Sequence, residues 1–279
     1  MSSSNALICN NNSDLIYNQE NESELFSGFF EIWLGEQNCD LEALIVAVNA
    51  KPESAQLKAE WTRSLSELVD RVMSHYENYY RVKSESVDHD VVGMLSPSWR
   101  SHLEDAFLWV GGWRPSMAFH LLYSILGLQF EAGFSELTRG LSTDDLANLS
   151  PSQLALVNDL QCRTIKAEKA LTEALAAHQE TVADTSMVEL SHLATELTRE
   201  PNPLTRDDSV GRRVDAMLAV KEDKLVDILH GADGLRVKTL KKVVEILSPI
   251  QAAHFLIGAA ELHLRVHEWG TKREAHLDT

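Results

Sequence analysis

Apolar residues recur every three or four positions along most of this 279-residue chain, and this spacing limits the fold more than any other feature. The clearest run advances by four, four, three, four, four and three residues, and comprises Leu57, Trp61, Leu65, Leu68, Val72, Tyr76 and Tyr79. Such a stripe is one face of an α-helix, expected to pack into a core. Strand patterns are nearly absent. The sequence therefore predicts an all-α fold, a single bundle-like domain of long antiparallel helices.

Two Ser-Pro-x-Gln segments mark helix starts. Residues 150–153 and 248–251 each place a serine at the N-cap, a proline at the first helical position and a glutamine at the third, as in a capping box. The first segment predicts a helix running to Val182, and the second predicts the last helix.

Polar stretches with proline or glycine predict the breaks between helices. They fall at residues 51–52, 82–97, 140–149 and 201–203, with residues 84–93 expected to be the most flexible loop. Because none is a convincing interdomain linker, we expect one helical domain over residues 22–275; two lobes hinged near Pro201 are the alternative. Residues 1–21, rich in Ser and Asn, are expected to be a disordered tail without a secretory signal.

A sharp corner is predicted at Trp109-Val110-Gly111-Gly112-Trp113-Arg114-Pro115-Ser116, which interrupts two apolar runs. Gly111 and Gly112 free the backbone, and Pro115 fixes φ for the helix that follows. Arg114 lies beside two indoles and is expected to stack there or to pair with a carboxylate from another helix.

Arg114 and Arg236 are both interpreted as members of structural ion pairs. Acidic residues lie near them in sequence, namely Glu104, Asp105 and Asp233. Anion binding is the weaker alternative, because the glycines lack the spacing of a phosphate-binding loop.

Charge and composition exclude several function classes. A formal net charge of −17 and a pI near 5.0 argue against direct binding to nucleic acid, and Lys238, Lys241 and Lys242 are interpreted as a solvated face. No apolar run approaches the roughly 20 residues that cross a membrane. The three cysteines lack a CxxC pairing, which favours a reducing compartment.

Several motifs in one order resemble the seed dormancy control domain of plant Delay-of-Germination proteins, which is also the C-terminal half of TGA-type leucine-zipper transcription factors. They are residues 109–116, Leu149-Ser150-Pro151-Ser152-Gln153-Leu154, Ala232-Asp233-Gly234-Leu235-Arg236 with Thr239-Leu240, Leu247-Ser248-Pro249-Ile250-Gln251-Ala252 and His263-Leu264-Arg265-Val266-His267-Glu268-Trp269-Gly270. The resemblance covers residues 26–270.

The resemblance implies a haem site at His263 and His267. Residues four apart lie on one helix face, about 6 Å apart at Cβ. Two imidazoles on one straight face do not comfortably clasp opposite sides of a planar macrocycle, so one is expected to ligate the haem iron while the other assists. The alternative is two ordinary, partly buried histidines near a helix end. Zinc is disfavoured because no third ligand can be assigned.

The resemblance also implies a contact with type 2C protein phosphatases of the abscisic acid pathway, through Phe29, Phe30, Glu31 and Trp33. The family pattern is altered here, because Ile32 separates the acid from Trp33 and Phe30 replaces an aliphatic residue. The alternative is a first helix that buries Leu25, Phe29, Ile32 and Trp33 in the core. An exposed Phe30 or Trp33 would favour binding.

No nucleophile elbow, HExxH segment or Rossmann glycine pattern organises the sequence for catalysis, so we expect no enzyme activity. The resemblance implies a regulatory or adaptor protein of seed dormancy or abscisic acid signalling, modulated by haem, in the nucleus and cytoplasm. A transcription-associated module like the effector half of TGA factors is the alternative; no basic region with leucine heptads precedes the domain. The sequence does not decide between a monomer and a homodimer.

Overall fold

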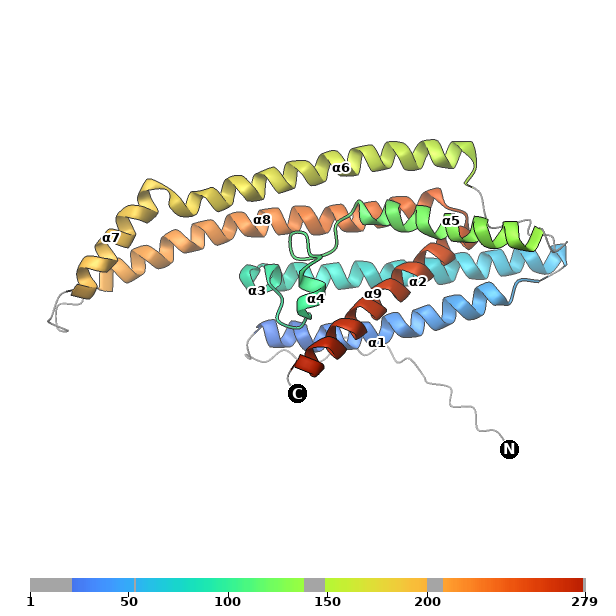
Figure 1. Ribbon diagram of the computed structural model, residues 1–279, viewed down its shortest axis with the longest axis horizontal. Coiled ribbons are helices and arrows are strands. Elements are labelled where there is room, and N and C mark those ends of the chain that lie inside the picture. The colour runs from blue at the N-terminus through green and yellow to red at the C-terminus, as the bar shows by residue number, and fades with distance from the viewer. Residues whose placement is uncertain (1–21, 53, 138–148, 200–207, 278–279) are drawn as a thin grey trace, which may run out of the picture.

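The computed structural model describes residues 22–52, 54–137, 149–199 and 208–277, which are largely helical (Figure 1). The helices, in chain order, are α1 (Glu22–Asn49), α2 (Ala55–Val87), α3 (Val91–Leu95), α4 (His102–Asp105), α5 (Met117–Leu137), α6 (Pro151–Glu180), α7 (Thr185–Arg199), α8 (Asp208–Ile246) and α9 (Pro249–Leu277). A short 3-10 turn, η1 (Thr181–Ala183), joins α6 to α7. The all-α prediction is confirmed.

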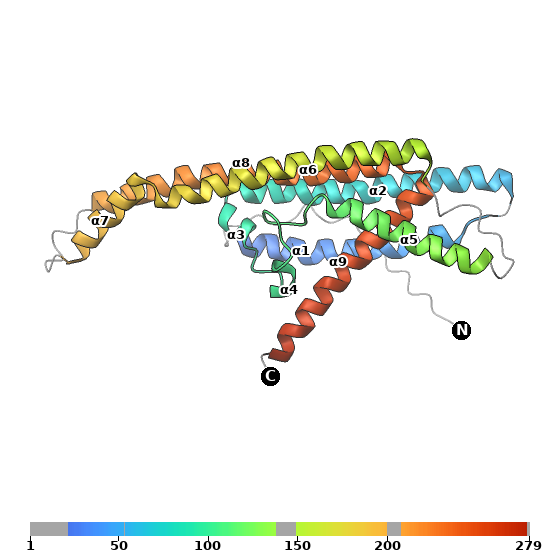
Figure 2. The ribbon, with the colours of Figure 1, turned by 45° about the horizontal axis from the view of Figure 1, so that its top comes forward.

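The long helices form a bundle with one extended end. Helices α1 and α2 run antiparallel, α8 packs along α2, and α6 runs antiparallel to α8 on the outer side (Figure 1). Helix α9 crosses α1 and α2, and its C-terminal end projects beyond the bundle (Figure 2). The distal part of α6, together with α7 and the first half of α8, extends beyond α3 at the opposite end from α5 (Figure 1).

Helix α2 confirms most of the apolar stripe. Ser54 caps its start, accepting a hydrogen bond from the Leu57 N–H at 3.4 Å. Leu65, Val72 and Tyr79 are buried, but Leu57 is 57% exposed, which corrects its predicted place in the core. Leu57 lies in the first turn, and packing against α1 begins one turn later, where Trp61 Nε1 donates to Ala47 O at 2.8 Å.

Helix α6 begins as its capping box predicts. The Ser150 hydroxyl accepts from the Gln153 N–H at 3.2 Å, and Gln153 Oε1 accepts from the Ser150 N–H at 3.0 Å. The reciprocal pair also forms at Ser248 and Gln251, so the predicted start of the last helix is confirmed.

The predicted flexible loop over residues 84–93 is wrong. Helix α2 continues to Val87, and α3 starts at Val91, where Asp90 caps it by accepting from the Gly93 N–H at 2.8 Å. Val87 and Val91 are 0% and 5% exposed, so burial of apolar side chains orders the segment despite its polar composition. The breaks predicted near residues 140–149 and 201–203 fall largely or wholly on 138–148 and 200–207, outside the described residues.

The buried apolar residues form two clusters. One gathers around Phe119, Leu122 and Leu256, where α2, α5, α8 and α9 meet. The other, which we call the aromatic cluster, contains Phe26, Phe30, Trp33, Tyr79 and Tyr80, with side chains from α3 and α8. Of the motif residues singled out by sequence, Val110 and Ala232 belong to the aromatic cluster, whereas Leu240, Leu247 and Ala252 belong to the first cluster.

Candidate functional site

The corner between residues 109 and 113, which we call the elbow, is a tight turn that requires its glycines. Trp109 N–H donates to Gly112 O at 2.7 Å, and Val110 and Gly111 adopt positive φ values of 47° and 64°. A Cβ at Gly111 would lie 2.7 Å from Met94 O, and one at Gly112 would lie 2.9 Å from Arg236 Cζ. Both positions therefore exclude a side chain.

Arg236 of α8 holds the elbow from inside the protein. Its side chain is fully buried, and it donates to the carbonyl oxygens of Trp113 at 2.7 Å, of Val110 at 2.8 Å and of Trp109. The guanidinium also pairs with Asp233 Oδ1 at 2.5 Å and lies over the Trp109 ring, 5.4 Å from its centroid. The predicted ion pair of Arg236 with Asp233 is confirmed.

Lys83 of α2 is a second buried cation at the elbow, and the sequence analysis missed it. Its ammonium donates to Gly111 O at 2.8 Å and to Asp233 Oδ1 at 3.0 Å. Burial lowers the pKa of Lys83 to about 8, against the opposing pull of the Asp233 carboxylate. A signal existed, because Lys83 continues the four-residue spacing of Tyr79 and Val87 on the buried side of α2.

Arg114 ties the elbow to α6. Its Nε donates to Glu168 Oε2 at 2.9 Å, and the other oxygen of Glu168 accepts from the Ser116 N–H. The expected pairing with a carboxylate of another helix is confirmed, although the partner is neither Glu104 nor Asp105. Glu168 could have been found as the single acid in the buried stripe Val157, Leu160, Thr164 and Glu168 of α6.

His263 of α9 is partly buried against α1. Its Nδ1 lies 2.7 Å from Gln37 Oε1, and Gln37 Nε2 donates to the Tyr76 hydroxyl at 2.9 Å. Burial, reinforced by the positive charge of Arg100, lowers the pKa of His263 to about 3, so the ring is neutral at physiological pH. Since an amide oxygen only accepts, the neutral ring donates from Nδ1.

His267 lies one turn further along α9 and contacts α4. Its Nδ1 lies 3.1 Å from Glu104 Oε2, which also accepts from the Ser101 N–H at 2.9 Å and the Ser101 hydroxyl at 2.8 Å. Burial acts to raise the pKa of Glu104, but these hydrogen bonds and the nearby cations leave it below its ordinary value. A Cβ at Gly270 would collide with Ser101, so this glycine lets α4 dock on α9.

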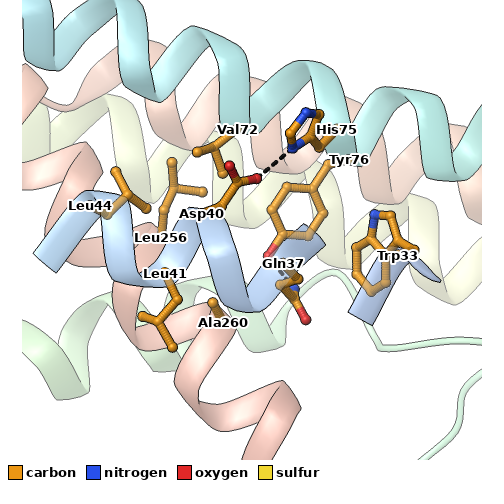
Figure 3. Close-up of a pocket in the computed structure, with 10 residues that line it drawn as sticks. All are labelled: Trp33, Gln37, Asp40, Leu41, Leu44, Val72, His75, Tyr76, Leu256 and Ala260. Atoms are coloured by element: carbon orange, nitrogen blue, oxygen red, sulfur yellow. Dashed lines mark hydrogen bonds and ion pairs between the residues drawn. The ribbon is translucent and has the colours of Figure 1, made fainter. Parts of the chain in front are cut away.

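The residues around the two histidines do not fit a haem. The rings of Phe30 and Trp33 pack against the imidazoles, with centroids 5.6 Å apart for Trp33 and His263 and 5.8 Å for Phe30 and His267. The cavity beside Gln37 encloses about 10 Å³, close to the room that one water molecule needs (Figure 3). The face of α9 expected to hold a macrocycle is therefore filled by side chains of α1.

The same small cavity shows how α1 is tied to α2 (Figure 3). Asp40 is 5% exposed, and its Oδ2 lies 2.5 Å from Nδ1 of His75. The hydrogen bond to Asp40 raises the pKa of His75 above its usual 6.5. Among the described residues, no group of three or more His, Cys, Asp or Glu side chains is placed to hold a metal ion.

The N-terminal aromatic segment contributes to the core and leaves its other side exposed. Phe30 is 0% and Trp33 5% exposed, so neither meets the condition that would favour their binding a partner. Leu25 and Phe29, which the core alternative placed inside, are only half-buried, and Glu31 is exposed. Ile32, which that alternative placed inside, is 62% exposed. Partner binding by this segment stays a prediction, with Glu31 and Ile32 as the residues in reach.

None of the helices within the described ranges is long and apolar enough to cross a membrane.

Known plant proteins match this sequence over most of its length. The family model for seed dormancy control matches residues 43–124, which run from α1 through the elbow into α5. Protein DOG1-like 3 of Arabidopsis thaliana is 32% identical over 234 residues, covering 81% of this chain and 79% of that protein. Protein DOG1-like 1 of the same plant is 30% identical, with 75% and 78% covered. Transcription factor TGA2.3 of Oryza sativa subsp. japonica is 31% identical over 84% of this chain but only 60% of that factor. The chain belongs to the seed dormancy control family of DOG1-like proteins.

Proposed function

We propose that this chain is a non-enzymatic regulator of seed dormancy or abscisic acid signalling that acts by binding another protein, with a type 2C protein phosphatase as the partner. Membership of the DOG1-like family supports the regulatory role. The observation that carries the binding role is the two-sided character of α1. Phe30 and Trp33 anchor its inner side, while Glu31 and Ile32 face outward.

The experiment that tests the proposal is a binding and inhibition assay with a purified type 2C phosphatase. We expect the wild-type chain to bind the phosphatase and to lower its activity, and Glu31→Lys to weaken binding by about tenfold. Glu60→Lys is the matched control, because Glu60 is an exposed acid near the start of α2. Absence of wild-type binding would contradict the phosphatase assignment. Phe30→Ala is unsuitable, since it would open the core.

A transcription-associated role is the second candidate, favoured by the similarity to TGA2.3 over 84% of this chain. In this proposal, the domain acts at promoters through a protein that itself reads DNA. Tethering the chain to a reporter promoter through an unrelated DNA-binding domain should change transcription. Unaltered reporter output would argue against this role.

Haem modulation stays a prediction and requires α9 to move away from Phe30 and Trp33. Titration with ferric haem measures it through the Soret band. A shifted band that is lost in His263→Ala and His267→Ala would support the prediction, whereas an unshifted band in the wild-type chain would contradict it.

A further inference from the structure

The outward side of α1 is a helix face that other described helices leave uncovered. Gly28, Ile32, Gly35 and Val46 are spaced by four, three and eleven residues, and therefore share one side of the helix. Ile32 and Val46 are 62% and 68% exposed, and Gly28 and Gly35 are exposed as well. We call these four residues the outer face of α1. Helix α1 lies along the edge of the bundle opposite α6 (Figure 1).

The glycines of the outer face border open space. A Cβ built on Gly28 or on Gly35 would meet no atom within 4 Å. Glycine inside a helix is unfavourable relative to alanine, and nothing within the described fold requires it at these positions. The distance between packed helices depends on the side chains at their contact, so two glycines on one face allow another backbone to approach closely.

The charge on α1 has one sign. The helix contains Glu22, Glu24, Glu31, Glu36, Asp40 and Glu42 and no lysine or arginine. Other exposed helices pair their acids internally, as Arg163 does with Asp159 on α6 and Lys272 with Glu268 on α9. Glu31 and Glu42 border the outer face on one side and are exposed, so α1 presents carboxylates there without cations of its own.

We propose that the outer face of α1 is the docking site for a helix of the partner protein that carries lysine or arginine along one side of a narrow apolar ridge. The inference rests on the proposed function, because it describes the protein that this chain regulates. Charge complementarity with Glu31 and Glu42 selects a basic partner, and the two glycines admit its ridge. Residues 28–46 span about 27 Å, the length of about five helical turns.

The probe is a 20-residue helical peptide with a ridge of leucine and alanine and with lysines along one side of that ridge, and its binding to the full chain is measured by fluorescence anisotropy. We expect Gly28→Leu/Gly35→Leu to lower peptide affinity by at least about tenfold. Gly211→Leu/Gly234→Leu is the matched control, because a Cβ at either position of α8 also meets open space, and it should change affinity less than twofold. Equal losses in the two pairs would overturn the proposal.

The charge part of the inference has its own control. Glu31→Lys/Glu42→Lys should lower affinity by about tenfold and flatten its dependence on salt, while Glu60→Lys/Glu222→Lys, at exposed sites on α2 and α8, should have little effect. Equal effects would show general attraction to an acidic chain and overturn the proposal. Thermal unfolding of Gly28→Ala/Gly35→Ala separates docking from folding, because we expect its midpoint to stay or rise while peptide affinity falls.

The phosphatase assay distinguishes failure of this inference from failure of the proposed function. Wild-type binding to the phosphatase that persists in Gly28→Leu/Gly35→Leu would overturn the docking site and leave the function standing. If the peptide binds in a glycine-dependent way but the phosphatase does not bind, the docking site is supported and the phosphatase is ruled out as the partner. If sedimentation shows a dimer that the glycine variants abolish, and the peptide does not bind, then the outer face of α1 binds a second copy of this chain. That result would overturn the proposal.

Discussion

Two glycine pairs, one at the elbow and one on α1, have opposite surroundings. Gly111 and Gly112 are buried, and a side chain at either would strike Met94 O or Arg236. Gly28 and Gly35 are exposed, and a side chain at either would meet open space. The first pair is required by the fold, whereas the fold of the described residues gives no reason for the second. A substitution at Gly28 or Gly35 can therefore change the affinity for a partner without disturbing the fold.

Charged groups follow the same division. At the elbow, Arg236, Lys83 and Asp233 are buried. Both cations donate hydrogen bonds to backbone carbonyls of the elbow and pair with the carboxylate of Asp233. On α1, Glu31 and Glu42 face solvent. The charges of the elbow thus stabilise the bundle, whereas those of α1 are exposed at its surface.

Arg236→Ala is the largest test of this comparison. It removes the donor for three elbow carbonyls and leaves Asp233 with Lys83 alone, so we expect a loss of about 3–5 kcal/mol in the free energy of unfolding. Urea denaturation measures it. Arg265→Ala, at an exposed residue of α9, should change stability by less than about 0.5 kcal/mol. A similar small change in Arg236→Ala would mean that the elbow holds its shape without this anchor.

Gly111→Ala should lower the free energy of unfolding by about 1–3 kcal/mol. The residue has a positive φ, and the added Cβ would lie too close to Met94 O. Chemical denaturation again gives the value. A neutral result would erase the distinction between the two glycine pairs.

His263 of α9 should make the protein sensitive to acid. The pKa of His263 is lowered from 6.5 to about 3, so below pH 6.5 the unfolded chain binds a proton that the folded chain refuses. Stability from this group is present above pH 6.5 and is lost as the pH falls towards 3, by up to about 1.4 kcal/mol per pH unit. His263→Gln should flatten the fall, as measured by urea unfolding between pH 6.5 and 4.5.

His75→Gln is the control with the opposite sign. The raised pKa of His75 gives stability that is present below its unfolded value of 6.5 and is lost as the pH rises through the folded value. Its variant should therefore lose stability at low pH relative to the wild-type chain. The same pH response in both variants would contradict the assigned environments.

Gly28→Ala should have the smallest effect, and it tests directly the contrast between the exposed glycines of α1 and the buried glycines of the elbow. The added methyl group favours the helix by about 0.5–1 kcal/mol and meets no neighbour. Thermal and urea unfolding should both show a small gain. A clear loss would place an unrecognised contact on α1.

The all-α architecture and most helix starts follow from local signals. The Ser-Pro-x-Gln segments predict caps because the hydrogen bonds they form join residues three apart. Order in residues 84–93 could not be foreseen, since it depends on the burial of Val87 and Val91 by distant helices. A local pattern of polar residues carries no information about that burial.

The candidate site was predictable in its residue types more than in its roles. Sequence indicated Arg114, Arg236, His263 and His267, but not that Gln37 and Glu104 would occupy the imidazole Nδ1 atoms from 226 and 163 residues away. Periodicity placed Phe30 and Trp33 on a helix without showing which side faced α9. Ile32, which the core alternative placed inside together with Trp33, is exposed, because each step of one residue turns a helix by about 100°.

The anchoring of the elbow by Arg236 also orders events during synthesis. Arg236 lies 123 residues after Trp113 and 126 after Val110, so these carbonyls lack their final donor until most of the chain has left the ribosome. The corner that turns the chain from α4 to α5 is therefore completed only when α8 arrives. A nascent chain halted before α8 must keep this turn solvated, and closing it is a late step of maturation.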